Sequence, residues 1–291
     1  MQRIGIGIKP GDARATALAV VLHERLTARG MQVHVCEELA SALPEAAIPI
    51  EMMTGLVDLM VSLGGDGTLL YVARRFVGHG TPILGINLGR LGFLTEAPAT
   101  DAFDAVDQAL QGKLKSKRHF ALRAECWRGE EQIAAGIAFN DVVLQRGEHP
   151  RMIEFEMQAR GQFLFRLRAD GLVLATPAGS TAYALSSGGP IVHPEVEAIS
   201  VVPICPHTLS NRPIVLPAGD RIELRLLDAP RHALLNLDGQ ENMKLHPGDR
   251  VTVVRGDEVT LLHQPDRHYF EVLRTKLQWA GQAVVQGMER G

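Results

Sequence analysis

Residues 57–77 read VDLMVSLGGDGTLLYVARRFV, and this stretch joins two segments of different hydrophobic pattern. Positions 57–63 are almost continuously apolar, which is typical of a parallel strand buried on both faces. Residues 68–77 carry apolar side chains at helical spacing. Because the glycine-rich turn 64–67 separates them, the stretch predicts a strand, a tight turn and a helix, the repeating unit of an α/β sheet.

The same alternation of strand and helix continues through the first part of the chain. Strands are predicted at 3–9 and 81–86, where apolar residues dominate. Asp12 is placed to cap a helix that Gly30 would end. We therefore expect residues 1–118 to form a Rossmann-like α/β domain, with a parallel sheet and helices on its faces.

After the polar, basic stretch 112–118 the hydrophobic period changes to two. Apolar and polar residues then alternate in several segments, which is typical of half-buried antiparallel strands. The apolar positions are Phe120, Leu122, Ala124, Cys126, Ile153, Phe155, Met157, Phe163, Phe165, Leu167, Ile222, Leu224 and Leu226. We expect residues 119–268 to form an antiparallel, β-sandwich-like domain and residues 269–291 to be helical or irregular.

Composition excludes several classes of function. The 291 residues carry 30 Lys and Arg against 33 Asp and Glu, so bulk electrostatic binding to nucleic acid is not expected. The 46% hydrophobic content is that of a folded chain, and no apolar run approaches the ~20 residues that a membrane span needs. Three widely spaced cysteines form no disulfide or zinc pattern, and residues 1–7 form no signal peptide. We expect a cytoplasmic protein without nucleic-acid or membrane partners.

The turn at 64–67 is the first candidate for chemistry, because it follows a buried strand at the edge where α/β sheets bind ligands. Its glycines would let backbone N–H groups approach phosphate oxygens at a helix start. Asp66 does not suit a pure phosphate cradle, since a carboxylate repels phosphate. It suits a base for an attacking hydroxyl, or an anchor for Mg²⁺ or a ribose hydroxyl. The alternative is a tight turn in which Asp66 or Thr68 caps the helix.

The second candidate is the stretch DGLVLATPAGSTAYALSSGGP at 170–190. Its small and hydroxylated residues suit hydrogen bonds to a sugar, amide or base, and Tyr183 could stack on a ring. The alternative is a Gly/Ser loop with a capping hydroxyl. Ser180 lacks flanking glycines at 178 and 182, so a serine hydrolase is not supported.

Two shorter motifs complete the candidates. Asn140 and Asp141 place an amide beside a carboxylate, which can hold two vicinal hydroxyls, although an Asn-Asp turn is the alternative. The sequence DGQ at 238–240 is the other, with a hairpin turn as its alternative. No P-loop is present, and Pro10 interrupts the dinucleotide fingerprint begun by the N-terminal glycines.

Five segments in this order resemble the NAD kinase family in its bacterial form. They are GGDGT at 64–68, GINLGRLGFLTE at 85–96, FNDVVL at 139–144, the stretch 170–194 and DGQ at 238–240. The glycine turn is shared with lipid kinases such as the diacylglycerol kinases, whereas the long Gly/Ser stretch is specific to NAD kinases. The resemblance runs through nearly the whole chain. It implies the two domains expected above, with the tail 269–291 packing back on the first.

The resemblance also implies an activity and its residues. NAD kinases transfer the γ-phosphoryl of ATP, in some members of polyphosphate, to the 2′-hydroxyl of the adenosine ribose of NAD. Asp66 would be the catalytic base, with Mg²⁺ or another divalent cation assisting but no protein residue assigned as its ligand. The matched phosphate-binding positions are Gly64, Gly65 and Gly67. The matched NAD-binding positions are Asp66, Gly67, Asn140, Asp141, Arg151, Arg168, Asp170, Thr181, Ala182, Tyr183, Ala184, Leu185, Ser186 and Gln240. The family also implies a homodimer or homotetramer.

Two positions depart from the family pattern or vary within it. Asp141 stands where many relatives carry Glu, which gives a shorter reach for the same charge. Arg168 occupies a variable position, and a cation there bears on the choice between NAD and NADH, because oxidised nicotinamide is positively charged. We expect a preference for NAD. The rival interpretations are a lipid kinase of the diacylglycerol type and a non-catalytic module that senses NAD.

Overall fold

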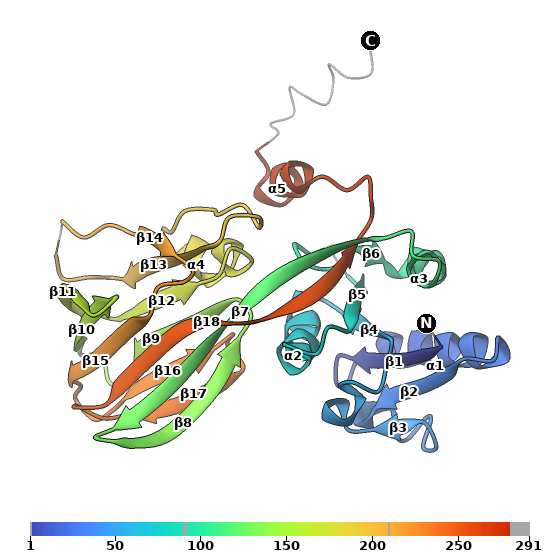
Figure 1. The fold of residues 1–291 in the computed structure, drawn as a ribbon, viewed down its shortest axis with the longest axis horizontal. Helices are drawn as coiled ribbons and strands as arrows, with labels where there is room; N and C mark the ends of the chain where they lie inside the picture. Colours follow the sequence, from blue (N-terminus) through green and yellow to red (C-terminus); the bar gives the residue numbers. More distant parts are fainter. Residues whose placement is uncertain (1, 90–91, 209, 280–291) are drawn as a thin grey trace, which may run out of the picture. The chain divides into compact units, whose positions relative to one another are not determined.

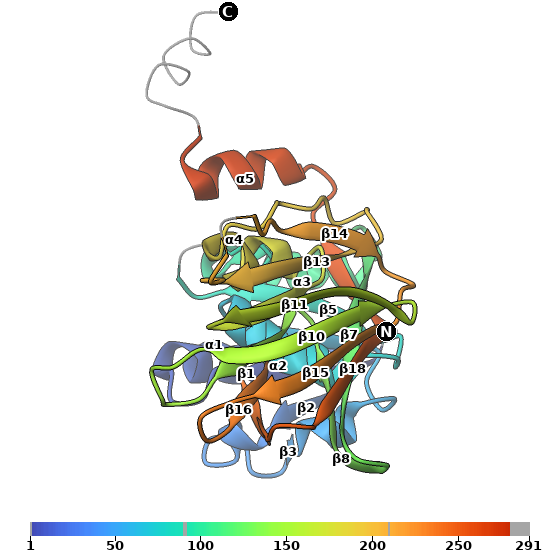
Figure 2. The same ribbon diagram turned by 90° about the vertical axis from the view of Figure 1, so that its left-hand side faces the viewer.

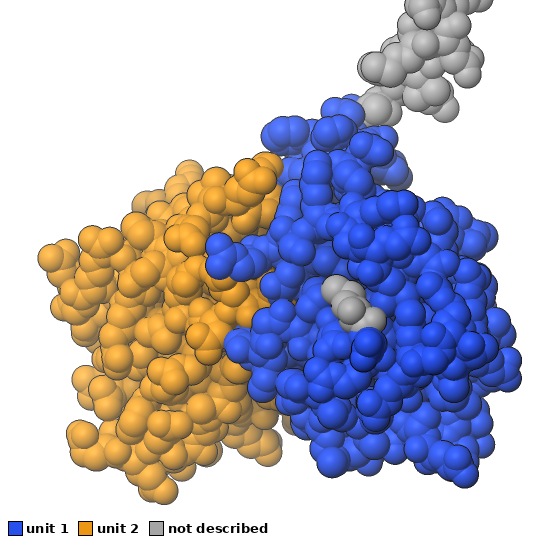
Figure 3. All heavy atoms as spheres, turned by 45° about the vertical axis from the view of Figure 1, so that its right-hand side comes forward, with its two compact units in different colours: residues 1–118, 260–291 blue, residues 119–259 orange. Residues whose placement is uncertain are grey.

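The computed structural model describes residues 2–89, 92–208 and 210–279. The chain divides into two compact units, one comprising 1–118 with 260–291 and the other 119–259 (Figure 3). Two long strands, β7 (Lys115–Arg128) and β18 (Arg250–His263), each have residues in both units. The first unit is therefore built from two separate stretches of sequence.

The first unit contains a parallel sheet, as the alternating pattern predicted. Its strands run in the order β5-β4-β1-β2-β3, and each neighbouring pair is parallel. Their bounds are β1 Arg3–Ile8, β2 Gln32–Cys36, β3 Ala47–Ile48, β4 Leu59–Gly64 and β5 Pro82–Asn87. Short β6 (Ala97–Pro98) pairs with β5, and the end of β18 also pairs with β5 in parallel, Thr260 with Pro82 and Leu261 with Ile83. The first sheet is thus completed by a strand that arrives late in the chain.

Helices alternate with these strands along the sequence, and one more follows the last strand, β18 (Figure 1). They are α1 Ala13–Ala28, α2 Asp66–Phe76, α3 Ala102–Leu110 and α5 Tyr269–Leu277, with single 3₁₀ turns at Glu37–Leu39, Ile50–Met53 and Ala99–Asp101. Asp12 caps α1 by accepting a hydrogen bond from the Arg14 N–H at 3.0 Å, and Gly30 follows the helix at φ +77°. Both predicted boundaries of this helix are confirmed. No helix within the described ranges is long and apolar enough to cross a membrane.

The second unit is antiparallel and contains strands of two sheets. In one sheet β11, β10, β15 and β18 are neighbours, which Figure 2 shows for β11, β10 and β15, and β7 pairs with β18 and β8. The other sheet has the order β14-β13-β12-β9-β16-β17. The remaining bounds are β8 Glu131–Ala138, β9 Asp141–Arg146, β10 Ile153–Ala159, β11 Gln162–Ala169, β12 Gly171–Ala175, β13 Ala198–Ile204, β14 Ile214–Pro217, β15 Ile222–Asp228, β16 Ala233–Leu237, β17 Glu241–Leu245, the 3₁₀ turn Gly179–Thr181 and α4 Tyr183–Ser186.

One apolar cluster joins the inner faces of the two sheets of this unit. Leu122 and Phe155 come from one sheet and Leu174 and Leu235 from the other, and all four are buried. This is the packing of a β-sandwich. The alternating positions predicted from the sequence are buried or half-buried, except Phe163, which is 62% exposed. Phe163 lies at the start of β11, the first strand in the order of its sheet.

The three cysteines are free, and two of them are buried. Burial is the main cause that raises the pKa of Cys36 to about 12 and that of Cys126 to about 11, so both thiols stay protonated at neutral pH. Cys205 is exposed. The part of the predicted tail at 280–291 lies outside the described residues.

Candidate active site

The glycine turn lies at the carboxyl end of β4 and leads directly into α2. A Cβ on Gly64 would lie 2.2 Å from Thr68 Oγ1, so only glycine fits between the strand and the first helical turn. A Cβ on Gly65 or Gly67 would meet no heavy atom within 4 Å, so the space beside these two residues is open. Gly65 is the N-cap residue of α2 and Asp66 its first residue. The alternative that Asp66 or Thr68 caps the helix is therefore wrong.

A cavity of about 270 Å³ adjoins the turn on the side of β1. Its lining residues are Ile8, Lys9, Pro10, Gly65, Gly67, Thr68 and Tyr71. Lys9 is exposed and brings a positive charge to the positive end of the helix dipole. The cavity is thus suited to an anionic group such as phosphate.

Asp66 is held by the loop that follows β5. Its Oδ2 accepts a hydrogen bond from the Phe93 N–H at 2.8 Å. Its Oδ1 accepts from the Leu94 N–H at 3.2 Å, and from both the N–H and the hydroxyl of Thr95 at 3.1 and 3.2 Å. A carboxylate offers about four acceptor positions, two on each oxygen. Oδ1 is therefore saturated, and Oδ2 keeps one position for a further donor.

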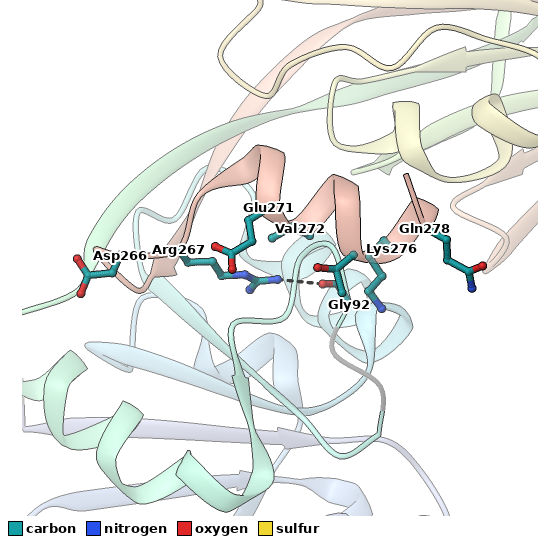
Figure 4. Close-up of a pocket in the computed structure, with 8 residues that line it drawn as sticks. Gly92, Asp266, Arg267, Glu271, Val272, Lys276 and Gln278 are labelled. Atoms are coloured by element: carbon teal, nitrogen blue, oxygen red, sulfur yellow. Dashed lines mark hydrogen bonds between the residues drawn. The ribbon is translucent and has the colours of Figure 1, made fainter. Parts of the chain in front are cut away.

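The loop itself is held from its other side by Arg267, which follows β18. Arg267 Nη2 donates to the Gly92 carbonyl at 3.0 Å, the dashed line in Figure 4, and Nη1 donates to the Thr95 carbonyl at 2.6 Å. Nη1 also pairs with the carboxylate of Glu96 at 2.9 Å. Sequence reasoning found the segment 85–96 but neither Glu96 nor Arg267, because no local pattern links residues so far apart.

Glu96 is a buried carboxylate with several partners. Its side chain is 0% exposed, and besides Arg267 it accepts from the Gln264 N–H at 2.7 Å and lies 2.9 Å from His263 Nδ1. Burial by itself raises the pKa of Glu96, but the hydrogen bond from His263 and the charge of Arg267 outweigh burial and hold that pKa below its ordinary value. Glu96 is thus an ionised anchor for the segment 263–267.

A larger cavity of about 780 Å³ lies between α5 and the 92–95 loop (Figure 4). Its charged lining residues include Arg267, Glu271 and Lys276. Figure 4 shows Arg267 reaching from the segment before α5 to the Gly92 carbonyl. The residue that holds the loop therefore also lines an open space.

In the second unit the predicted pair Asn140–Asp141 is organised by Asp238. The Asp238 carboxylate accepts the backbone N–H groups of Phe139, Asn140 and Asp141 at 2.7, 2.7 and 3.0 Å. Asp238 has φ +54° in the hairpin between β16 and β17, so the hairpin alternative for DGQ is confirmed. Sequence reasoning assigned Gln240 from this motif and missed Asp238. An acidic residue in a turn was the only local signal.

Asn140 and Asp141 are both buried, at 9% and 5% exposure. Asn140 Oδ1 has no hydrogen-bond partner among the described residues, which is uncommon for a buried acceptor. Burial, and then the neighbouring Asp238 charge, raise the pKa of Asp141 to about 7. At neutral pH the Asp141 carboxyl is therefore present in both its protonated form, which can donate a hydrogen bond, and its ionised form, which can only accept one. It is next in sequence to Asn140, whose amide oxygen is an acceptor left unpaired within the described part of the chain.

The Gly/Ser stretch packs directly against this pair. The Thr176 hydroxyl donates to the Phe139 carbonyl at 2.7 Å, and a Cβ on Gly179 would lie 2.1 Å from the Asn140 carbonyl oxygen. Ser180 is 0% exposed and is bonded to the Pro177 carbonyl and the Val192 N–H. Ser180 is thus a structural residue, consistent with the argument against a serine hydrolase.

The remaining predicted positions differ in accessibility. The exposed positions are Tyr183, Ser186, Arg151, Arg168 and Gln240, and the half-buried positions are Thr181, Ala182 and Leu185. Asp170 forms an ion pair with Arg146 at 2.9 Å. The side chain of Ala184 is fully buried in a small cluster with Val143 and Val202, so its predicted contact with NAD would have to be made by its backbone.

These features define a class of protein. It has one α/β unit and one β unit, and its site suits a ligand that carries phosphate and hydroxyl groups. The family description "ATP-NAD kinase N-terminal domain" matches residues 4–114, and "ATP-NAD kinase C-terminal domain" matches 139–263. The chain belongs to the NAD kinase family. The family, the fold and the NAD kinase activity that the sequence resemblance implied are confirmed.

Individual relatives support this assignment. The NAD kinase of Thiobacillus denitrificans is 45% identical over 280 residues, covering 95% of this chain and 96% of that protein. The NAD kinase of Citrifermentans bemidjiense is 43% identical over 286 residues, covering 96% and 99%. Among solved structures, yeast NADH kinase complexed with NADH superposes with a TM-score of 0.89 at 27% identity, covering 97% of this chain and 89% of that chain. An NAD kinase from Archaeoglobus fulgidus in complex with ATP has a TM-score of 0.74 at 26% identity, covering 96% and 100%.

Proposed function

We propose that this chain transfers the γ-phosphoryl of ATP to the 2′-hydroxyl of the adenosine ribose of NAD, with Asp66 as the general base. The observation on which the proposal rests is the hydrogen bonding of the Asp66 carboxylate. Three backbone N–H groups and one hydroxyl hold it in a fixed orientation, and one acceptor position on Oδ2 stays open. A ribose hydroxyl that donates to this position would be aligned and partly deprotonated during attack.

This division of labour suits phosphoryl transfer, in which positioning and charge compensation matter more than covalent chemistry. Asp66 orients the acceptor hydroxyl and takes its proton. The open space beside Gly65 and Gly67, with the α2 N-terminus and Lys9, receives the phosphates. Gly64 contributes by its close approach to Thr68 rather than by a contact of its own.

A divalent cation fits this donor set only as a partner of the phosphates. Within 2–89, 92–208 and 210–279 no group of three or more acidic, histidine or cysteine side chains is placed to hold a metal. Mg²⁺ is commonly retained by substrate phosphates and water with one or two carboxylates, so a protein cage is not required. Bound in this way, Mg²⁺ would neutralise charge on the transferred group.

The NAD-binding set is proposed from the second unit. Asn140 Oδ1 and Asp141 would bind ribose hydroxyls, because one is an unpaired acceptor and the other can donate or accept near neutral pH. Tyr183, 43% exposed on α4, offers a ring for stacking. The further proposed contacts are Gly67, Arg151, Arg168, Asp170, Thr181, Ala182, Leu185, Ser186 and Gln240.

An acceptor and donor panel tests the proposal. Purified protein is incubated with Mg²⁺ and either ATP or polyphosphate, and with NAD, NADH or a diacylglycerol dispersion. We expect NADP from ATP and NAD, and no phosphorylated lipid. Lipid phosphorylation without NADP would overturn the proposal in favour of a lipid kinase. NAD binding without any product would instead favour a sensor.

The finer properties expected from the sequence stay predictions. They are a preference for NAD over NADH, a homodimer or homotetramer, and a cytoplasmic location. Arg168 is exposed on β11, so its charge is available to a bound dinucleotide. The NADH arm of the same panel tests the cofactor preference.

A further inference from the structure

The Gly92–Phe93 peptide group is held at both ends by side chains of opposite charge. Its carbonyl accepts from Arg267 Nη2 at 3.0 Å, and its N–H donates to Asp66 Oδ2 at 2.8 Å. Hydrogen bonds in such a chain polarise one another. The hydrogen bond from the Phe93 N–H occupies one acceptor position on Oδ2 and so determines the direction of the position that stays open. Arg267 therefore influences the direction of this open position through a single peptide group.

At the other end of the loop the same two side chains bond to one residue, Thr95, through two successive peptide groups. Arg267 Nη1 donates to the Thr95 carbonyl at 2.6 Å, while the Thr95 N–H and hydroxyl donate to Asp66 Oδ1. The loop is thus held by a guanidinium through its carbonyls and by a carboxylate through its N–H groups. Two points of attachment fix both its position and its tilt.

Close packing reinforces this arrangement. A Cβ on Gly92 would lie 1.8 Å from Asp66 Oδ1, so the loop backbone rests directly against the carboxylate. A small displacement of the loop would therefore displace the carboxylate as well.

Arg267 is itself fixed in place. Its side chain is 14% exposed and pairs at 2.9 Å with Glu96, whose side chain is 0% exposed. Glu96 also accepts from the Gln264 N–H at 2.7 Å. Charge-assisted bonds between a planar guanidinium and a buried carboxylate are directional, and an ammonium group cannot reproduce their geometry.

We propose that Arg267 is a positioning residue for phosphoryl transfer: by holding the 92–95 loop it sets the orientation of the Asp66 carboxylate toward the acceptor hydroxyl. The inference rests on the proposed role of Asp66 as base. Arg267 touches neither the acceptor nor the phosphates in this scheme. Its effect belongs to the turnover number rather than to ligand affinity.

The test compares the full-length variants Arg267→Gln and Arg267→Lys with the wild type in steady-state NADP formation. A misplacement of about 1 Å in a reacting group costs on the order of a hundredfold in rate. We expect Arg267→Gln to lower kcat by at least about tenfold while the KM values for NAD and ATP change by less than about twofold. Arg267→Lys should lie between, because an ammonium group can keep the Glu96 pair but not both carbonyl bonds.

Arg128→Gln is the matched control for loss of an ion pair. Arg128 makes two 2.9 Å bonds to Asp249, whose side chain is 2% exposed, within the unit 119–259. This variant should lower Tm by less than Arg267→Gln does, because the Arg128 side chain is 51% exposed, and should leave kcat unchanged. If both variants reduced kcat in proportion to their loss of Tm, Arg267 would be merely structural and the inference overturned.

The double variant Asp66→Asn/Arg267→Gln separates this inference from the proposed function. If Arg267 acts through Asp66, the double variant should have the single-turnover rate of Asp66→Asn alone, because the two residues form one unit. If Asp66→Asn kept wild-type kcat, the base role would fall. If Asp66→Asn were impaired and the two losses multiplied in the double variant, only the positioning role would be overturned.

Discussion

Asp238 holds the backbone of Asp141 and also raises the pKa of its side chain. The Oδ1 of Asp238 accepts a hydrogen bond from the Asp141 N–H at 3.0 Å, and the negative charge of Asp238 adds to the effect of burial on the Asp141 carboxyl. The same carboxylate holds the N–H groups of Phe139 and Asn140. One side chain in a hairpin far away in the sequence therefore fixes the backbone of the predicted ribose-binding pair and, after burial, adds to the raised pKa of Asp141.

We expect Asp238→Asn to destabilise the second unit and raise the KM for NAD. The amide offers a single acceptor oxygen to three N–H donors, and an unsatisfied buried donor costs about 1–3 kcal/mol. Thermal unfolding and the KM for NAD check this. Asn242→Asp, at an exposed position in the same hairpin, is the control and should change neither. A wild-type KM in Asp238→Asn would contradict the role assigned to Asp238.

The pKa of Asp141, raised to about 7, gives a pH dependence of stability. Between the ordinary aspartate range and about pH 7 the unfolded chain is ionised at this site and the folded chain is protonated, so stability falls as pH rises through that window. Asp141→Asn removes this contribution. The free energy of unfolding of the variant, relative to wild type, should therefore increase from pH 4.5 to pH 7 and level off above. A constant difference across this range would be inconsistent with the raised pKa.

Glu96 should show the opposite dependence. Its pKa is held below the ordinary value, so its stabilising pair with Arg267 is present above the unfolded pKa and is lost as pH falls through the folded pKa. Breaking a buried pair by removing one partner costs about 3–5 kcal/mol. Glu96→Gln should thus destabilise the protein strongly at pH 7 in urea unfolding, and much less in acid. Equal destabilisation at both pH values would contradict this assignment.

Asp66→Asn tests the base directly. General base catalysis contributes about 10²–10⁴-fold, so kcat should fall by that order while calorimetry still detects NAD binding. Circular dichroism and Tm show whether the fold persists, since the amide has fewer acceptor positions for the 92–95 loop. Unchanged turnover in a folded Asp66→Asn protein would refute the base role.

Gly92→Ala tests the contact between the loop and the carboxylate. The added methyl would lie 1.8 Å from Asp66 Oδ1, so the loop must move and both kcat and Tm should fall. Gly89→Ala is the control nearby, because a Cβ there meets only Asn87 Oδ1 at 3.8 Å. If the two variants were equally active, the close approach at Gly92 would not matter for turnover.

Local patterns predicted part of the strands and helices, the change of period near residue 118 and the place of Asp66 at the end of a buried strand. The apolar run before the turn, the cap at Asp12 and the two-residue period after residue 118 each reflect interactions within one element. What holds Asp66 and Asn140 in place was not predictable, because Arg267 lies 175 residues from Gly92 and Asp238 lies 98 residues from Asn140. Such partners depend on strand order and register, which no short window contains.

The pairing of Thr260 and Leu261 with β5 has a consequence for synthesis on the ribosome. When residues 1–118 have emerged, the backbone of Pro82 and Ile83 still lacks this partner, and it gains the partner only after the whole second unit has been translated. An unpaired strand edge is a template for association with other chains. During synthesis the first sheet of the nascent protein therefore has an exposed edge that can associate with other chains. Protection of this edge by chaperones should matter most before residue 261 has been translated.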